Sequence, residues 1–454
     1  MFTRLRLQNF KCFKDTGDLD IRPLTFLMGP NSSGKSSILQ ALLMLRQTAD
    51  SPDVGNPLRL DGPYVSIPYR DLVFGHAYRE RLTIDLTVKK RPPGRTIELG
   101  RARLSFTVEF GYSVKGMRVY LSRAHYERRS LSDIFADDEK MSPEEYEAAS
   151  ATDLGITMER GAKGRYTVAL VEGQNRFETG ATALHKFCWP RTLDGTSDSL
   201  PVIERLGELS RETYSLLTKH LEALAYIGPL RDWPKRAYVA SGETPQDVGL
   251  KGEYSADVLW IQSRRKKTRE ALLGKVNRWA RELDMASQVA LRRLGQSNYY
   301  SIMFTDPKTG LEVNLADVGF GASQVLPVLV EGFYSARDAT LLIEQPEIHL
   351  HPRAQATLGD LLIDIEKSGK TLIVETHSEH LVGRIQRRIA EGKLSPDKVA
   401  LYYFEPTPEG TQIKRIGITE RGQFEPEGLP EGFFEEAYRE SLAHAEAILK
   451  DAPR

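Results

Sequence analysis

The chain has 454 residues, 40% of them hydrophobic, which is enough for two or three domains with well-packed cores. Its 62 Lys and Arg balance 62 Asp and Glu, which excludes an overall positive field for nucleic acid and leaves only a local patch. Two cysteines, Cys12 and Cys188, are too few for a disulfide framework, as in a reducing interior. No apolar run approaches the roughly 20 residues of a membrane span, so a cytoplasmic protein without membrane contact is expected.

The N-terminal part of the chain carries strand and helix patterns in turn. Residues 2–10 alternate, and LTFLM at 24–28 is a short apolar run ending in glycine, which predicts a buried strand. Apolar residues at helical spacing after Gly34 predict a helix. Alternating segments between about 80 and 185 predict an antiparallel β lobe, in which the acidic stretch 132–150 is interpreted as a solvated excursion.

Two later segments, 201–224 and 254–294, look helical. The second carries Arg264, Arg265, Arg278, Arg281, Arg292 and Arg293. As one basic face, a helix from Arg264 to Arg293 could contact a phosphate backbone. The alternative is a solvated helix with acidic counterparts nearby.

An α/β rhythm returns after residue 310. The patterns predict a helix over 323–335, a strand over 340–344, a helix from Pro352 to Gly369, a strand over 371–376, a helix over 379–391, and strands near 399–404 and 411–418.

The segment 29–37, GPNSSGKSS, fits the P-loop pattern between a predicted strand and a predicted helix. Its glycines let successive N–H groups face a phosphate, Lys35 reaches the β and γ oxygens, and the Ser36 hydroxyl ligates Mg²⁺. The predicted nucleotide-binding residues are Gly29, Asn31, Ser32, Ser33, Gly34, Lys35, Ser36 and Ser37.

A P-loop Mg²⁺ needs an acidic partner on a neighbouring strand. The run 341–344 is interpreted as the only apolar run that ends in a carboxylate at a suitable distance downstream, so Glu344 is the predicted metal-side carboxylate. The next residue is the amide Gln345, which can position a water molecule but cannot take its proton.

The segment 317–330, DVGFGASQVLPVLV, could by itself be a loop that caps a helix. It precedes the Glu344 strand, however, and His377 follows the next strand. A Gly-rich helix start, an acidic strand and a histidine-ended strand in this order are typical of an ABC-type ATPase.

The sequence resembles the ABC-type ATPases of the SMC and OLD group, and within them stand-alone AAA-like bacterial ATPases of anti-phage systems such as Septu and PARIS. The resemblance rests on LQNFKCFKD, GPNSSGKSS, LDGPYVSIPYRDLVFGH, YIGPLRDWPKRAY, VGLKGE, DVGFGASQVLP, EQPEIHLHP, THSEHL and LPEGFFEEAYRE. It implies an α/β P-loop NTPase of the SMC/OLD head type with an antiparallel β lobe and a helical insertion, and the cofactors ATP and Mg²⁺.

The resemblance also implies a homodimer, or a higher homo-oligomer, in which ATP lies between one subunit's P-loop and the other's signature loop. His377 would be the switch histidine near the γ-phosphate. The signature residues acting in trans would be Gly319, Gly321, Ser323 and Gln324.

In such sites the residue after the metal-side carboxylate polarises the attacking water. Either Gln345 only orients that water and hydrolysis is slow, or Glu347 supplies the base. His349 and His351 are interpreted as a D-loop-like segment rather than zinc ligands. Arg231 either lines the site or ties the lobes together.

The expected domains are the P-loop part of the ATPase (1–80), the β lobe (81–200), the helical insertion (201–300), and the part with signature loop, acidic strand and histidine (301–454). The residues after His380 are too few for the TOPRIM nuclease of OLD proteins. The expected function is an ATP-driven sensor or scaffold that controls a separate effector, a nuclease. The alternative is a DNA-repair or chromosome-associated clamp that grips duplex DNA.

Overall fold

The computed structural model describes residues 1–89, 103–129, 154–161, 164–172, 175–186, 189–194, 214–264 and 266–425. The acidic stretch 132–150, Cys188, Arg265 and the C-terminal segment LPEGFFEEAYRE lie outside these ranges.

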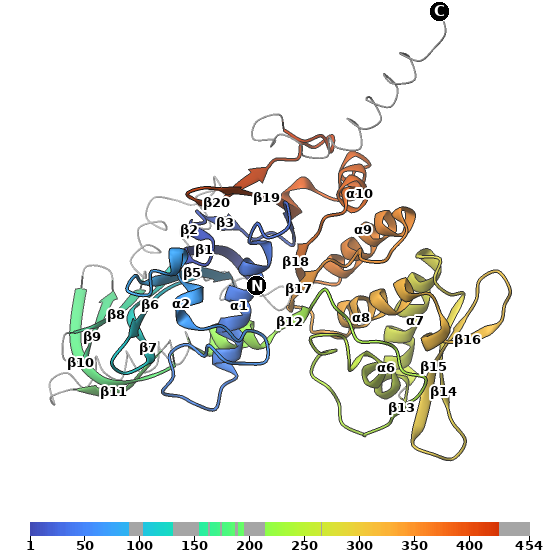
Figure 1. The fold of residues 1–454 in the computed structure, drawn as a ribbon, viewed down its shortest axis with the longest axis horizontal. Helices are drawn as coiled ribbons and strands as arrows, with labels where there is room; N and C mark the ends of the chain where they lie inside the picture. The colour runs from blue at the N-terminus through green and yellow to red at the C-terminus, as the bar shows by residue number, and fades with distance from the viewer. Residues whose placement is uncertain are drawn as a thin grey trace, which may run out of the picture.

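A six-stranded sheet forms the centre of the molecule (Figure 1). Its strands, in spatial order, are β12 (Leu224–Ile227), β17 (Thr340–Glu344), β18 (Thr371–Glu375), β4 (Leu24–Met28), β19 (Val399–Thr407) and β20 (Gly410–Ile416). The first five are parallel, and β20 runs antiparallel to β19. β4, β17 and β18 are buried along their whole length, which explains their continuous apolar runs.

Alternate residues of this sheet belong to two different cores. Leu342 and Ile373 join the core with α1 and the β lobe, whereas Leu341 and Leu372 join the core with the later helices. Figure 1 shows α1 on one side of the sheet and the later helices on the other. These helices are α1 (Lys35–Ala49), α8 (Phe320–Tyr334), α9 (Pro352–Lys367) and α10 (Glu379–Ala390).

The strand order decides what meets the P-loop. β18 lies between β4, which leads into the P-loop, and the acidic strand β17. Glu344 and Glu375 are register partners, and Glu375 pairs in turn with Leu27 of β4. Both carboxylates therefore reach the carboxyl edge of the parallel sheet, where such folds bind their ligands.

The predicted antiparallel β lobe is present as a second, ten-stranded sheet. Its strands are β1 (Phe2–Phe10), β2 (Phe13–Asp15), β3 (Leu19–Asp20), β5 (Leu82–Lys89), β6 (Arg103–Ser113), β7 (Arg118–Arg129), β8 (Leu154–Arg160), β9 (Tyr166–Glu172), β10 (Asn175–His185) and β11 (Trp189–Asp194). Because β1 pairs with β5, the expected boundary at residue 80 cuts through one sheet. A short helix, α2 (Tyr69–Leu72), lies between β4 and β5 in the sequence.

The predicted helical insertion contains α6 (Ser255–Ser263) and α7 (Lys266–Glu282), together with a four-stranded sheet. That sheet is built from β13 (Tyr238–Val239), β14 (Gln288–Arg293), β15 (Tyr299–Thr305) and β16 (Glu312–Asn314). The expectation of helix up to residue 294 was wrong, because residues 288–293 form β14 and pair antiparallel with β15. The expected helix over 201–224 also ends early, since β12 begins at Leu224. No helix among the described residues is both long and apolar enough to cross a membrane.

Glu331 gives the fold a pH dependence. It lies inside α8 with 1% of its surface exposed, and its Oε2 accepts the Val248 N–H at 2.8 Å. Burial raises its pKa to about 7. The protonated side chain therefore stabilises the fold at low pH, and this contribution is lost as the pH rises through about 7. We expect the difference in free energy of unfolding between Glu331→Gln and the natural protein to shift by about 2 kcal/mol in favour of the variant from pH 5 to pH 8. Urea unfolding of both proteins at both pH values measures this difference. A difference that does not change with pH would contradict the assignment.

Candidate nucleotide-binding site

Residues 29–34 join β4 to α1 through backbone conformations that favour glycine. Gly29 and Gly34 have φ values of 142° and 94°. A Cβ on Gly34 would lie 2.2 Å from Cys12 Sγ, so no side chain fits there. The loop curls at the N-terminus of α1, where the first N–H groups have no partners within the helix. The predicted succession of strand, loop and helix is confirmed.

Lys35 places a positive charge inside this loop. Its ammonium donates to the carbonyl oxygens of Gly29 at 3.1 Å and Pro30 at 2.7 Å, and it is 97% buried. Burial lowers the pKa of Lys35, against the opposing effect of the carboxylates Glu375 and Glu344. A phosphate oxygen is a stronger acceptor for an ammonium than these carbonyls, so the side chain is poised to exchange them for a phosphate.

Ser33 has an unused hydrogen-bonding group in the same loop. Its side chain is fully buried, and Oγ has no hydrogen-bond partner among the described residues. Buried polar atoms are nearly always satisfied, so this hydroxyl marks a position that a ligand would complete.

Ser36 contacts a carboxylate that the sequence interpretation missed. Its Oγ donates to Glu375 Oε2 at 2.7 Å, and Glu375 is 96% buried at the end of β18. The view that 341–344 was the only suitable apolar run was wrong, because TLIVE at 371–375 also ends in a carboxylate. That signal was present in the sequence, but only the strand order places β18 beside the P-loop strand.

Glu344 lies next to Glu375 and is held on two sides. The Tyr226 hydroxyl donates to its Oε1 at 2.8 Å, and the Arg231 guanidinium donates to its backbone carbonyl at 2.8 Å. Burial, followed by the charge of Glu375, raises the pKa of Glu344 to about 7, and burial raises that of Glu375 as well. Two neighbouring buried carboxylates repel each other and are stabilised by a divalent cation.

The donor set fits Mg²⁺, which prefers carboxylate and hydroxyl oxygens. Ser36, Glu344 and Glu375 would hold the ion, and it would neutralise charge on the phosphates when bound. Among the described residues, no three His, Cys, Asp or Glu side chains gather into a metal site. The protein therefore offers a pair of carboxylates and a hydroxyl, which leaves coordination positions for phosphate and water.

Gln345 and Glu347 occupy the turn after β17. Gln345 has a φ of 42°, and its N–H donates to the Glu375 carbonyl at 2.8 Å. Glu347 is buried, and its Oε1 accepts the backbone N–H of His377 at 2.7 Å, whereas Oε2 has no partner within the described chain. Glu347 thus ties the turn after β17 to the turn after β18, which is a positioning contact.

His377 follows β18 with an exposed side chain. Partial desolvation and the positive charge of Lys35 lower the pKa of its imidazole. The ring is therefore neutral at physiological pH and lies near enough to the P-loop lysine to feel its charge.

Arg231 contacts the backbone of the acidic strand and of the turn that follows it. It is 95% buried, and its guanidinium donates to the carbonyls of Glu344 at 2.8 Å and Gln345 at 3.4 Å. We expect Arg231→Met to remove a donor from the buried carbonyl of Glu344 and from that of Gln345, which keeps the Ile348 N–H, and to lower the free energy of unfolding by about 2 kcal/mol. Denaturant unfolding measures this, with Arg70→Met as the control, because Arg70 is an exposed residue of α2. Equal stability of the two variants would contradict the role.

The predicted signature residues lie at the start of α8. This helix begins at Phe320, three residues earlier than the helix predicted over 323–335. Gly319 precedes the helix and is exposed, and a Cβ on Gly321 would lie 2.7 Å from the His349 carbonyl. Ser323 and Gln324 are buried within their own subunit, and the Ser323 hydroxyl donates to the Phe320 carbonyl at 2.8 Å. The accessible part is therefore the glycine-rich end.

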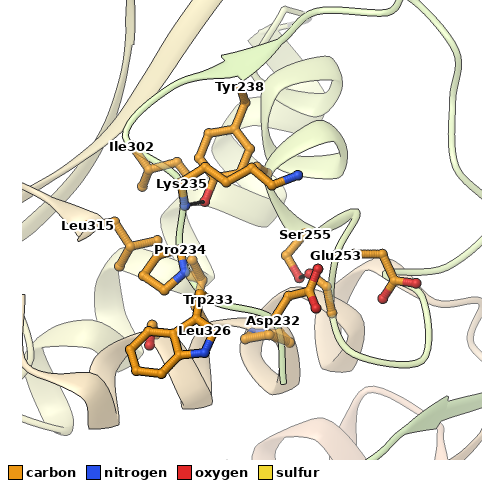
Figure 2. Close-up of a pocket in the computed structure, with 14 residues that line it drawn as sticks. Asp232, Trp233, Pro234, Lys235, Tyr238, Glu253, Ser255, Ile302, Leu315 and Leu326 are labelled. Carbon is orange, nitrogen blue, oxygen red and sulfur yellow. Dashed lines mark hydrogen bonds between the residues drawn. The ribbon is translucent and has the colours of Figure 1, made fainter. Parts of the chain in front are cut away.

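A pocket lies between α8 and the segment that follows Arg231 (Figure 2). Asp232, Trp233, Pro234 and Lys235 line it together with Ser323 and Leu326 of α8. Trp233 is 75% exposed and contacts the Phe320 ring, with the centroids 4.6 Å apart. The segment that contains Arg231 thus connects the acidic strand to the signature loop.

His349 and His351 serve different local roles. The His349 ring packs edge-on against Phe320 at 4.7 Å, and His351 Nδ1 accepts the Arg353 N–H at the start of α9. Asp71 of α2 lies 3.4 Å from the His76 imidazole.

The predicted basic helix is divided in the structure. Arg292 and Arg293 lie on β14, whereas Arg278 lies on α7. Arg278 pairs with Asp364 at 3.5 Å, and Arg292 pairs with Glu312. These acidic counterparts are those of a solvated surface, so no single helical face presents the arginines from 264 to 293.

Parts of the chain are similar to known proteins. Residues 1–91 and 259–382 match a family model described as an AAA ATPase domain. An OLD nuclease from Thermus scotoductus is 48% identical over 42 residues, which is 9% of this chain and 8% of that protein. The chain thus matches a small fraction of the length of this curated relative.

Solved SMC head domains are also similar. The SMC head of Thermotoga maritima is 11% identical with a TM-score of 0.38, over 92% of this chain and 99% of that one. An SMC head derived from Pyrococcus furiosus, bound to the C-terminal domain of ScpA, is 12% identical with a TM-score of 0.40, over 98% and 99%.

The fold is that of an α/β P-loop NTPase with an added antiparallel β lobe. This follows from the order of the parallel strands and the glycine-rich loop between β4 and α1. The match to the ATPase family model, which spans less than half of the chain, and the short similarity to an OLD nuclease support a relation to ATPases of the SMC/OLD type.

Proposed function

We propose that this chain binds Mg²⁺ and ATP at residues 29–37, pairs head to tail around the nucleotide, and hydrolyses it slowly or conditionally. The observation that carries the proposal is the convergence of Lys35, Ser36, Glu344 and Glu375 on one edge of the sheet. Gln345 follows Glu344 at the position where a general base would accept the proton of the attacking water. Its amide cannot accept that proton, so hydrolysis is slow and ATP stays bound for longer.

In this proposal the exposed start of α8 is the surface that completes a partner's site. Residues 318–322, 349–351 and 281–285 line an open groove of about 830 Å³. A triphosphate held by one P-loop would place its negative charge against the N-terminus of the partner's α8. ATP would thereby join two neutral chains, and hydrolysis would release them.

The proposed cellular role is that of a cytoplasmic sensor or scaffold in an anti-phage defence system. The sequence motifs shared with the ATPases of such systems support it. A separate effector, a nuclease, would be held by the ATP-bound pair and freed when phage is present. The DNA clamp has less support, because Arg278 and Arg292 of its expected face lie on different elements, α7 and β14, and each pairs with a carboxylate.

Mass measurement tests the pairing. Size-exclusion chromatography with light scattering should show twice the monomer mass with Mg²⁺ and ATP, and the monomer mass without nucleotide. Lys35→Ala should stay monomeric in both. If neither nucleotide nor Lys35→Ala changes the mass, the proposal of an ATP-linked dimer is contradicted.

The effector is tested separately. The tagged protein, purified from its native host with ATP and Mg²⁺, should carry a stoichiometric second polypeptide. Lys35→Ala should lose it, and a natural protein that purifies alone would count against the scaffold role.

A further inference from the structure

Glu375 is a buried carboxylate beside the P-loop that the sequence motifs did not assign to the site. We propose that Glu375 is a second magnesium-side carboxylate that, together with Glu344, makes nucleotide binding conditional on Mg²⁺. The inference rests on the proposed function, since it assumes that residues 29–37 hold ATP. It adds that the site rejects a triphosphate that arrives without a divalent cation.

The geometry brings Glu375 to Ser36 and places Glu344 on the next strand beside Glu375. Glu344 and Glu375 end adjacent parallel strands as register partners, and strands in a sheet lie about 4.8 Å apart. Both side chains are at least 93% buried, so water screens their repulsion poorly. Glu375 Oε2 already accepts the hydroxyl of Ser36, the residue that a P-loop offers to Mg²⁺.

The positive charges of Lys35 and Arg231 do not neutralise the two carboxylates. The Lys35 ammonium is 3.9 Å from Glu375 and is shared with two loop carbonyls. The Arg231 guanidinium faces the carbonyls of Glu344 and Gln345 rather than either carboxylate. A free triphosphate would therefore add negative charge beside two buried carboxylates, whereas a bridging cation turns this repulsion into attraction on both sides.

Ser36 can serve both groups at once. Its hydroxyl hydrogen is donated to Glu375, and the lone pairs of the same oxygen are left to ligate Mg²⁺. Glu375 thus orients the Ser36 oxygen for a cation that the carboxylate and the hydroxyl would bind together. Removing the charge at 375 keeps the shape of the site but removes the repulsion.

Binding of a fluorescent, slowly hydrolysed ATP analogue tests this. Affinity is measured at constant ionic strength with excess Mg²⁺ or with excess EDTA. We expect the natural protein to bind about 100-fold more tightly with Mg²⁺. Glu375→Gln should bind about tenfold more tightly in EDTA than the natural protein does, so that its own ratio falls to about tenfold or less.

Two variants control for other effects. Glu375→Asp keeps the charge and should keep most of the Mg²⁺ dependence. Glu331→Gln removes a different buried carboxylate, on α8, and should leave the ratio unchanged. A ratio in Glu375→Gln equal to that of the natural protein overturns the proposal.

A second readout does not depend on any variant or on nucleotide. Mg²⁺ alone should raise the thermal unfolding midpoint of the natural protein, because it binds the folded carboxylate pair. An unchanged midpoint overturns the paired site. Failure of the underlying function looks different, since the analogue would then not bind even with excess Mg²⁺.

Discussion

Lys35→Ala is expected to weaken ATP binding by about 100-fold, because the triphosphate loses a charge-assisted hydrogen bond from a buried ammonium. The contacts to Gly29 and Pro30 show that this ammonium already lies within the loop. Phosphate oxygens would replace these weaker acceptors. Isothermal titration of ATP with Mg²⁺ measures the change, and the ATP-dependent increase in mass should disappear with it.

Lys414→Ala is the matched control for that experiment. Lys414 lies on β20 and pairs with Glu405 at the surface, so its removal makes the same change in net charge far from the P-loop. We expect this variant to bind ATP as the natural protein does. If both variants lose affinity equally, the effect is one of net charge and not of the loop.

Gln345→Glu is expected to raise the rate of ATP hydrolysis at least about tenfold, since general-base catalysis contributes about 100-fold to 10,000-fold. A carboxylate at 345 can take the proton that the amide cannot. The backbone at this position has a φ of 42° and donates its N–H to the Glu375 carbonyl, and glutamate can keep both features. Phosphate release under single-turnover conditions measures the rate.

Gln345→Ala separates orientation from proton transfer. If the natural amide orients the attacking water, this variant should hydrolyse ATP more slowly than the natural protein, with similar affinity. Glu347→Gln should change the rate little, because Glu347 Oε1 already accepts the His377 N–H. An unchanged or lower rate in Gln345→Glu would contradict the assigned role.

The elements that carry the site were predictable from the sequence because their signals are local. LTFLM is apolar throughout since β4 is covered on both faces, and residues 29–34 need glycines because of their positive φ values. The strand ending at Glu344 and the helix from Pro352 follow from the same kind of pattern. Residues 288–293 were misassigned because a short strand was absorbed into a longer helical run.

The second carboxylate, Glu375, could not be assigned to the site from such local patterns. TLLIE and TLIVE end in the same way, and nothing within either run says which strand lies beside the P-loop. Hydrogen bonding between strands places β18 next to β4 and β17 beyond it. This brings Glu375 to Ser36 and gives Glu347 the His377 N–H as its partner.

The sequence by itself determined the P-loop, the acidic strand with its neighbouring amide, and the class of fold, because each depends on residues adjacent along the chain. The tertiary structure alone decided that Glu375 meets Ser36 and that Arg231 holds the turn of Gln345. These two contacts join residues 339 and 114 positions apart, and strand order and burial, not local propensity, set which of them form.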